Sequence, residues 1–306
     1  MPMRDVVIFT AADARFFRLC LGLVLSLLRA APERPRIRIL DLGLAPDQIR
    51  ALAPLVEAIL PPRWHVPARQ PLPVAFRGFT ARPFLPSYVD DAEVIVWLDA
   101  DTWVQEWAPL AGLIEASRQG PMAIVEERYG PDLRIRQRQG DGSYVQLDIK
   151  VERRRENVKK TYRECFGEEI AASLGDLPSF NGGVWALRRD APGWAVYAEL
   201  LEAGLSRAVS NLTEQQALNI AIRTGRIPVS PQPTICNFTL NQDLPAFDSE
   251  RNRFVRREPP HEPIGVIHFT DLKFLTHLTL THIPAGDTRA VPIQFLDWLG
   301  APLAPL

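Results

Sequence analysis

Short apolar runs alternate along the chain with longer stretches of helical character. Runs rich in β-branched residues, without polar alternation, are typical of strands that are buried on both faces of a parallel sheet. The predicted strands are residues 5–10, 36–40, 94–98, 122–126 and 184–187. The predicted helices are residues 16–28, 47–60, 110–118, 192–203 and 213–224. This alternation predicts an α/β chain with a mostly parallel sheet between helices.

The composition changes between residues 128 and 163, which are rich in arginine. Residues 132–151 alternate around Gly140, Asp141 and Gly142, a pattern that predicts a hairpin, and a basic helix follows it. We interpret the segment as an insertion. It is either an acceptor-binding lip, a patch for anionic lipid headgroups, or a solvated hairpin and helix whose arginines pair with interspersed acids.

The overall composition is that of an ordinary globular protein. The 306 residues are 46% hydrophobic and carry a formal net charge of -1, which argues against nucleic acid as a partner. The three cysteines are far apart in sequence, so we expect reduced thiols and a cytoplasmic protein. We expect one large domain over residues 1–283 and a proline-rich tail over residues 284–306, where Phe295 and Trp298 either anchor to a membrane or partner, or dock onto the domain itself.

The strand at residues 94–98 stops abruptly at two carboxylates, Asp99 and Asp101. Ligands bind at the carboxyl ends of strands in open α/β sheets, and residues two apart on an extended backbone point to one side. Two carboxylates this close favour a divalent cation that bridges to a phosphorylated substrate. The alternative is a turn in which Asp99 caps a helix and Asp101 is solvated.

Three further segments carry candidate site residues. Residues 179–187 are interpreted as a polar turn with paired glycines that leads into an apolar strand. The paired glycines let a ligand or a neighbouring backbone approach closely. The helix at residues 213–224 begins with polar side chains. A short strand within residues 265–273 ends in His268 and Lys273, although a lone histidine on an apolar strand is more often a core residue.

Taken together, these motifs resemble the retaining glycosyltransferases of the group that includes glycogenin and the bacterial lipopolysaccharide galactosyltransferases (family 8). The resemblance runs from Val6 to Lys273, with gaps at the insertion. The matching motifs are FTAAD (residues 9–13), LDAD (98–101), FNGGV (180–184), EQQALN (214–219) and IHFTDLK (267–273). The resemblance implies a GT-A, Rossmann-like fold with a mixed, mostly parallel central sheet flanked by helices.

The resemblance also implies a role for each matched residue. The implied metal ligands are Asp99, Asp101 and His268. The residues implied to bind the nucleotide-sugar donor are Thr10, Asp13, Phe16, Arg82, Ala100, Asn181, Gly182 and Lys273. Glu214 and Gln215 are implied at the catalytic positions, and Glu126 or Glu127 is a further acidic sugar contact. Glu214 stands where the family has aspartate, and the segment from His268 to Lys273 is one residue shorter than in the family.

The implied activity is the transfer of a hexose from a UDP-sugar, with UDP-glucose or UDP-galactose as the donor, to a hydroxyl acceptor with retention of configuration. Two carboxylates and an imidazole favour Mn²⁺ over Mg²⁺. Glutamine is a poor nucleophile, so we favour front-face attack over double displacement. The implied acceptor is a glycan, a lipid-linked glycan or a protein, with peripheral contact at the inner face of a membrane.

Two other functions compete with this one. Apolar residues followed by Asp-Xaa-Asp are also the signature of haloacid-dehalogenase-like phosphohydrolases. Here, however, Trp103 holds the fourth position after Asp99, where that family has Thr or Val, and about a third of the chain precedes the motif. The second alternative is a non-catalytic module that binds nucleotide sugars on the same scaffold, since fold alone does not establish function.

Overall fold

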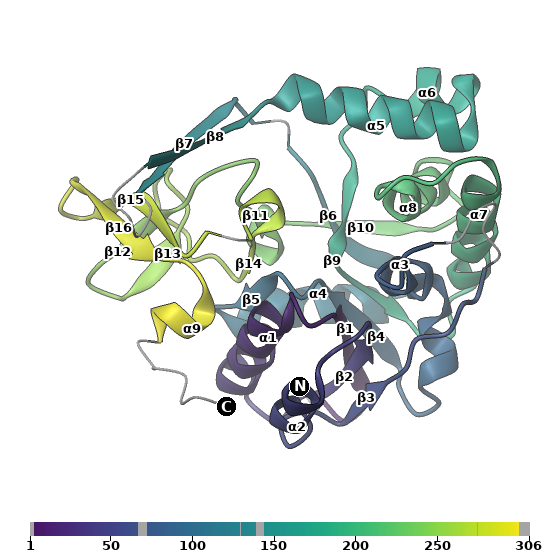
Figure 1. Cartoon of the computed structure of the whole chain (residues 1–306), viewed down its shortest axis with the longest axis horizontal. Helices are drawn as coiled ribbons and strands as arrows, with labels where there is room; N and C mark the ends of the chain where they lie inside the picture. Colours follow the sequence, from purple (N-terminus) through teal and green to yellow (C-terminus); the bar gives the residue numbers. More distant parts are fainter. Residues whose placement is uncertain (1–2, 67–71, 129, 139–143, 274, 300–306) are drawn as a thin grey trace.

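A seven-stranded sheet forms the centre of the computed structural model, which describes residues 3–66, 72–128, 130–138, 144–273 and 275–299 (Figure 1). In spatial order its strands are β10 (Val229–Gln232), β6 (Met122–Glu126), β9 (Phe180–Arg188), β4 (Val94–Leu98), β1 (Val6–Ala12), β2 (Arg36–Asp41) and β3 (Ala58–Leu60). β9 runs antiparallel to both of its neighbours, and the other pairs are parallel. The expected mixed, mostly parallel sheet is confirmed.

Helices cover both faces of this sheet because alternate residues of each strand point to opposite sides. All five residues of β4 are buried; Val94 and Val96 belong to one apolar core, and Ile95 and Trp97 to another. The first core packs under α1 (Phe17–Ala30) and α4 (Trp107–Arg118). The second lies under α7 (Gly193–Arg207), α8 (Thr213–Arg223) and the 3-10 helix η1 (Arg82–Tyr88).

Two smaller sheets extend the domain beyond the carboxyl end of β4. The first has the order β11 (Phe238–Thr239), β14 (Val266–His268) and β5 (Thr102–Val104), so the strand that follows Asp101 pairs with the strand that ends in His268. The second has the order β13 (Arg253–Val255), β12 (Ala246–Asp248), β15 (His277–Ile283) and β16 (Thr288–Pro292). The first of these sheets therefore joins two distant parts of the sequence at one point.

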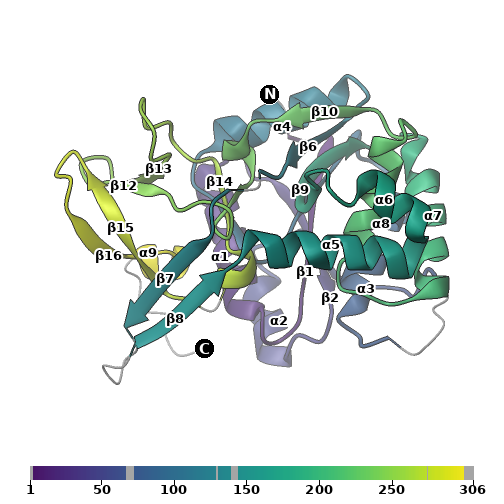
Figure 2. The same ribbon diagram turned by 90° about the horizontal axis from the view of Figure 1, so that it is seen from above.

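The basic insertion forms the predicted hairpin and helix (Figure 2). Its elements are β7 (Leu133–Arg138), β8 (Tyr144–Ile149), α5 (Val151–Phe166) and the short α6 (Glu168–Leu174). β7 and β8 are antiparallel, and the predicted turn at residues 140–142 lies outside the described residues. Lys159 forms an ion pair with Asp176, and Arg163 with Glu168. This pairing favours the interpretation of a solvated helix whose cations have local partners.

The C-terminal aromatic residues dock onto the domain. The rings of Phe295 and Trp298, in α9 (Phe295–Trp298), lie 5.3 and 5.5 Å from the ring of Trp103. The guanidinium of Arg29 lies 5.1 Å from the Trp298 ring. Of the two interpretations of this aromatic pair, the contacts favour docking. Within the described ranges, no helix has the length and apolar character that a membrane span requires.

Two sequence-based expectations are wrong. The helix predicted over residues 47–60 ends much earlier, since α2 spans Pro46–Leu52 and residues 58–60 form the edge strand β3. Pro54 explains the break, because proline has no N–H with which to continue the helical hydrogen bonds beyond Ala53. The polar glycine turn at residues 180–183 is instead the first half of β9, which begins at Phe180.

A further short helix lies before η1. It is α3 (Phe76–Thr80), whose Phe76 and Phe79 rings pack edge to face at 5.7 Å. The proline-rich segment at residues 61–73 lies partly outside the described ranges.

Candidate active site

A cleft of about 470 Å³ opens at the carboxyl ends of β1 and β4, which is the edge that the sequence predicts for ligand binding. Its volume falls in the usual range for small-molecule sites of about 300–1,000 Å³. Of the predicted site residues, those that line the cleft are Asp13, Phe16, Arg82, Asp99, Ala100, Asp101, Asn181, Glu214, Gln215, His268 and Lys273. Thr10 is buried in β1 and does not line the cleft, nor does Gly182 in β9.

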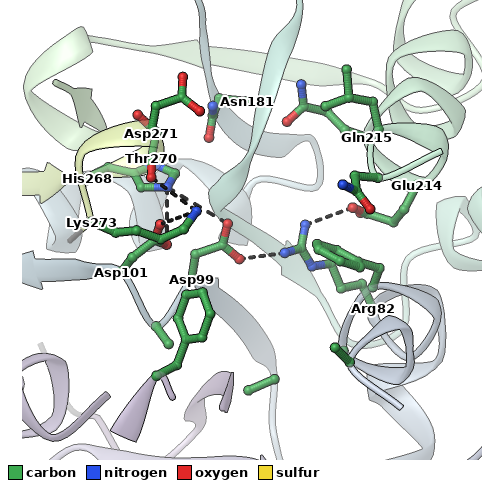
Figure 3. A pocket seen from close by; sticks show the side chains of 18 of the residues that line it. Arg82, Asp99, Asp101, Asn181, Glu214, Gln215, His268, Thr270, Asp271 and Lys273 are labelled. Atoms are coloured by element: carbon green, nitrogen blue, oxygen red, sulfur yellow. Dashed lines mark hydrogen bonds and ion pairs between the residues drawn. The ribbon is translucent and has the colours of Figure 1, made fainter. Parts of the chain in front are cut away.

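Asp99, Asp101 and His268 converge on one point of the cleft (Figure 3). One ligand atom from each residue lies within 4.8 Å of the others. His268 Nε2 is 3.5 Å from Asp101 Oδ1 and 3.9 Å from Asp99 Oδ2. The pairing of His268 with Thr102 between β14 and β5 brings the histidine to a carboxylate pair that is more than 160 residues away in sequence.

A hydrogen bond at His268 Nδ1 leaves Nε2 of the ring available to bind a cation. Its Nδ1 lies 2.9 Å from the amide oxygen of Asn237, so this nitrogen carries the proton and donates it, and Nε2 faces the carboxylates. Asn237 in turn donates to Asn181 Oδ1 at 3.0 Å. Carboxylate oxygens with a neutral imidazole are a recognised donor set for first-row divalent ions. The residues therefore fit a divalent metal.

The electrostatics agree with a site that attracts positive charge. Burial would raise the pKa of Asp101, but His268 and Lys273 hold it below its usual value. Burial would likewise lower the pKa of His268, but the neighbouring carboxylates raise it. Lys273 Nζ is 3.9 Å from Asp101 Oδ2 and also donates to the backbone carbonyl of Thr270. Lys273 therefore lies beside the carboxylate pair.

A buried arginine connects the carboxylate pair to α8. Arg82 as a whole residue is 4% exposed, and its guanidinium donates to Asp99 Oδ1 through Nη2. Through Nη1 it donates to Glu214 Oε2 at 2.8 Å and to the carbonyl oxygen of Gly182 at 3.1 Å. Its face covers the indole of Trp97 at 4.6 Å, and Trp97 also donates to Asp99 Oδ1 at 2.7 Å.

Glu214 and Gln215 lie side by side at the start of α8 but have different surroundings. Glu214 is 3% exposed, and its second carboxylate oxygen accepts a hydrogen bond from the phenol of Tyr197. Burial raises the pKa of Glu214 to about 7, even though Arg82 opposes the shift. Gln215 is less buried, and its amide oxygen accepts a hydrogen bond from the Gly182 N–H at 3.1 Å.

Asp13 and Phe16, which the resemblance assigns to the nucleoside, also line the cleft. The Asp13 carboxylate accepts hydrogen bonds from the Arg15 backbone and guanidinium and from the Phe16 N–H. Lys273 Nζ lies 5.7 Å from the Phe16 ring. An aromatic ring therefore lies close to Lys273, and the Asp13 carboxylate is anchored next to that ring.

Further polar side chains, from residues 127, 154, 181, 241 and 271, form a polar wall of the cleft. Glu127 pairs with Arg154 of α5 at 3.1 Å and accepts a hydrogen bond from the Asn181 amide at 2.7 Å. Asn241 donates to Asp271 Oδ2 at 2.8 Å. Of the two predicted acidic contacts, Glu127 lines the cleft, while Glu126 pairs with Arg223 outside it. Thr270, next to Asp271, has a φ of +50°, an unfavourable conformation that is often found at functional sites.

The sequence did not indicate the residues that hydrogen-bond to the site residues and hold them in place. Tyr197 and Trp97 read as core residues of a helix and a strand, and their polar atoms find partners only in the folded chain. Asn237 precedes a two-residue strand and belongs to no motif. For these three residues the sequence pattern carried no signal.

No protein-family model matches the sequence, and no curated protein matches it. Among solved structures, the apo form of mouse xyloside xylosyltransferase 1 matches with a TM-score of 0.52 at 10% identity. The match covers 89% of this chain and 99% of that chain. The chain has the GT-A glycosyltransferase fold.

Other proteins that match this chain are the galactosyltransferase LgtC and the bifunctional glycosyltransferase WbbM. LgtC, solved with donor and acceptor sugar analogues, matches at 17% identity and a TM-score of 0.45, covering 86% of both chains. WbbM matches at 15% identity and a TM-score of 0.47, covering 76% of this chain. The chain spans 39% of the WbbM chain. At these identities the likeness concerns the GT-A fold alone.

Proposed function

We propose that this protein is a metal-dependent glycosyltransferase that moves a hexose from a UDP-sugar to a hydroxyl acceptor with retention of configuration. The observation that carries the proposal is the convergence of Asp99, Asp101 and His268 at the carboxyl end of β4, inside the cleft of a GT-A fold. UDP-glucose and UDP-galactose are the donors we favour. The donor set favours Mn²⁺ over Mg²⁺.

In this proposal, Asp99, Asp101 and His268 hold the metal against the diphosphate, and Lys273 adds a point charge beside Asp101. When bound, the metal neutralises the negative charge that develops on the diphosphate as the bond to the sugar breaks. Lys273 supports the same charge electrostatically from the other side of Asp101. Asp13 and Phe16 bind the uracil end, by hydrogen bonding and stacking respectively. Ala100 supplies backbone next to the donor.

The chemical step in this proposal is a front-face substitution. The acceptor oxygen forms a bond to the anomeric carbon on the face from which UDP departs, and the bond between that carbon and the phosphate oxygen breaks. UDP leaves with the electron pair, and the acceptor proton passes to a phosphate oxygen. Gln215, whose amide is held by the Gly182 N–H, is too weak a nucleophile for a covalent intermediate and instead faces the developing positive charge as a neutral dipole.

The acceptor, in this proposal, approaches along the polar wall. The wall offers hydrogen-bonding groups from Asn241, Asp271 and the Arg154–Glu127 pair. The charge of Arg154 is already balanced by Glu127, so the wall favours an uncharged hydroxyl compound such as a glycan over an anionic acceptor. A lipid-linked glycan or a glycosylated protein would present the same hydroxyls. A cytoplasmic location is part of the proposal and rests on three buried free cysteines.

The competing phosphohydrolase function requires a first aspartate that is free to attack phosphorus. Asp99 Oδ1 instead accepts hydrogen bonds from both Arg82 and Trp97, which hold the carboxylate in place. This arrangement favours a carboxylate that binds a metal over one that acts as a nucleophile.

The test is turnover of UDP-glucose and UDP-galactose with Mn²⁺, measured as UDP release with and without a panel of neutral saccharides. We expect slow hydrolysis of one donor without acceptor, and its acceleration by at least one saccharide. Nuclear magnetic resonance of the product would report retained anomeric configuration. Nucleotide binding without release of UDP from any donor would favour the non-catalytic module, and release of inorganic phosphate would favour the phosphohydrolase.

A further inference from the structure

Glu214 pairs with Arg82, and both carboxylate oxygens of Glu214 already have partners in the protein. Oε2 accepts from Arg82 at 2.8 Å, and Oε1 accepts from the hydroxyl of Tyr197 (Figure 3 shows the Arg82 contact). The side chain is 3% exposed. A carboxylate that is buried and engaged at both oxygens is poorly placed to bind a sugar hydroxyl as well.

Arg82 depends on this carboxylate for its orientation. Its two terminal nitrogens divide between Glu214 and Asp99, and its Nε has no hydrogen-bond partner among the described residues. The guanidinium lies between the rings of Phe79 at 5.2 Å and Trp97 at 4.6 Å. If Glu214 were lost, the polar partners left for this buried cation in the described part of the chain would be Asp99 and one carbonyl oxygen.

Tyr197 fixes the other side of the carboxylate. It lies in α7, is fully buried and packs in the core beneath η1, the helix that begins with Arg82. A buried phenol is costly without a hydrogen-bond partner, and here its hydroxyl donates to Glu214. The hydrogen bonds therefore form one chain from the core to the carboxylate pair: Tyr197, Glu214, Arg82 and Asp99.

We propose that Tyr197 and Glu214 are positioning residues that hold the Arg82 guanidinium against Asp99 and toward the donor, and that Glu214 does not itself contact the sugar. The inference rests on the proposed function. Glutamate suits this role because it is one methylene longer than aspartate and so reaches Arg82 from the first turn of α8. Arg82 in turn acts on the donor near the bond that breaks, where misplacement by roughly 1 Å can lower the rate by about 100-fold.

The experiment is a double-mutant cycle with Tyr197→Phe and Arg82→Lys, and with Tyr88→Phe as the control. Tyr88→Phe removes a phenol hydroxyl that contacts Arg63 and His65 outside the cleft. The first readout is the urea midpoint of unfolding, which needs no donor. We expect Tyr197→Phe to shift the midpoint in the wild-type background and much less in the Arg82→Lys background.

The second readout is the Mn²⁺-dependent hydrolysis of UDP-glucose and UDP-galactose. We expect Tyr197→Phe and Glu214→Gln to lower kcat by roughly 10- to 100-fold with little change in KM, because they misplace Arg82 without removing it. In the Arg82→Lys background, Tyr197→Phe should have little further effect. Tyr88→Phe should keep the wild-type kcat.

The outcomes separate this inference from the proposed function. Equal shifts of the midpoint in both backgrounds would overturn the inference, whether or not the protein turns over a donor. A wild-type kcat in Tyr197→Phe would overturn it as well, while leaving the glycosyltransferase proposal intact. A rise in KM at constant kcat in Glu214→Gln would show that Glu214 contacts the donor directly. Absence of UDP binding and hydrolysis in the wild type would overturn the proposed function alone, since the midpoints still test the coupling.

Discussion

Gly183 gives a way to disturb the candidate metal site without replacing any ligand. It lies in β9, where a Cβ atom would stand 2.3 Å from His268 Cε1 and 2.8 Å from Asp99 Oδ2. The backbone of Gly183 is not in the left-handed region, so alanine is acceptable to the main chain. The Gly183→Ala methyl group would therefore act by displacing His268 and Asp99, and it would also press on Asn181 Oδ1, which lies 3.0 Å from the added Cβ.

The magnitude follows from contact distances. Carbon atoms pack at about 3.5–4.0 Å, and the added Cβ would lie 2.3 Å from His268 Cε1, so the ring must retreat by roughly 1.2–1.7 Å. Metal–ligand distances tolerate only about 0.2 Å, so the imidazole would lose its bond to the cation. We expect Mn²⁺ affinity to fall by roughly 10- to 100-fold, as it does when groups that orient a ligand are changed. Overpacking should cost about 1–3 kcal/mol of unfolding free energy.

The assay is a calorimetric titration of Mn²⁺ into protein saturated with UDP, with thermal unfolding followed by circular dichroism to establish that each variant is folded. Gly182→Ala is a comparison at the neighbouring position, because its added Cβ would meet Arg82 Nη1 at 3.2 Å and Gln215 Oε1 at 3.6 Å but no metal-ligand residue directly. Gly112→Ala, in α4, would meet no atom within 4 Å and controls for the substitution itself. A folded Gly183→Ala protein that binds Mn²⁺ as tightly as the wild type would refute the placement of the metal.

Three further predictions concern other parts of the molecule. Asn237→Leu removes the acceptor that orients the metal-binding histidine, and should weaken Mn²⁺ binding by about 10-fold in the same titration; an unchanged affinity would contradict the orienting role. The Glu214 carboxyl contacts Arg82 and Tyr197, and its burial raises its pKa from 4.5 to about 7. The folded state therefore binds the Glu214 proton more tightly than the unfolded chain does. The wild type should therefore lose up to about 3 kcal/mol of stability relative to Glu214→Gln as the pH rises from 4.5 through 7, and a pH-independent difference in urea unfolding would disprove the shift. Trp298→Ala removes aromatic contacts worth about 1 kcal/mol or more and should lower thermal stability without changing flotation with anionic liposomes; reduced flotation at unchanged stability would instead indicate a membrane anchor.

The sequence alone predicted the parts of the fold that depend on local pattern. The run Val94–Leu98 is apolar at every position, and all five residues are buried. The carboxylates at its end lie at the sheet edge where ligands are expected, because a strand that ends in polar residues delivers them there. The positions of Asp99 and Asp101 followed from that pattern, and His268 was proposed through the family resemblance.

What the sequence could not predict depends on contacts between distant segments. The helix predicted through residue 60 stops at Leu52, since apolar periodicity continued past Pro54 while the backbone did not. The antiparallel direction of β9 is set by its neighbours in the sheet and leaves no mark in its own residues. Asn237 and Tyr197 support the site only because tertiary pairing gives their polar atoms partners.

The most direct test of the account is the binding of UDP by calorimetry, first with Mn²⁺ and then with EDTA, in the wild type and in Asp101→Ala. We expect UDP to bind with Mn²⁺, to bind much more weakly with EDTA, and to lose its metal-dependent affinity in the variant, because Asp101 is a buried carboxylate of the proposed metal site. Binding of UDP that is equally strong with EDTA, or no binding in either condition, would contradict the assignment of this cleft as a metal-dependent donor site.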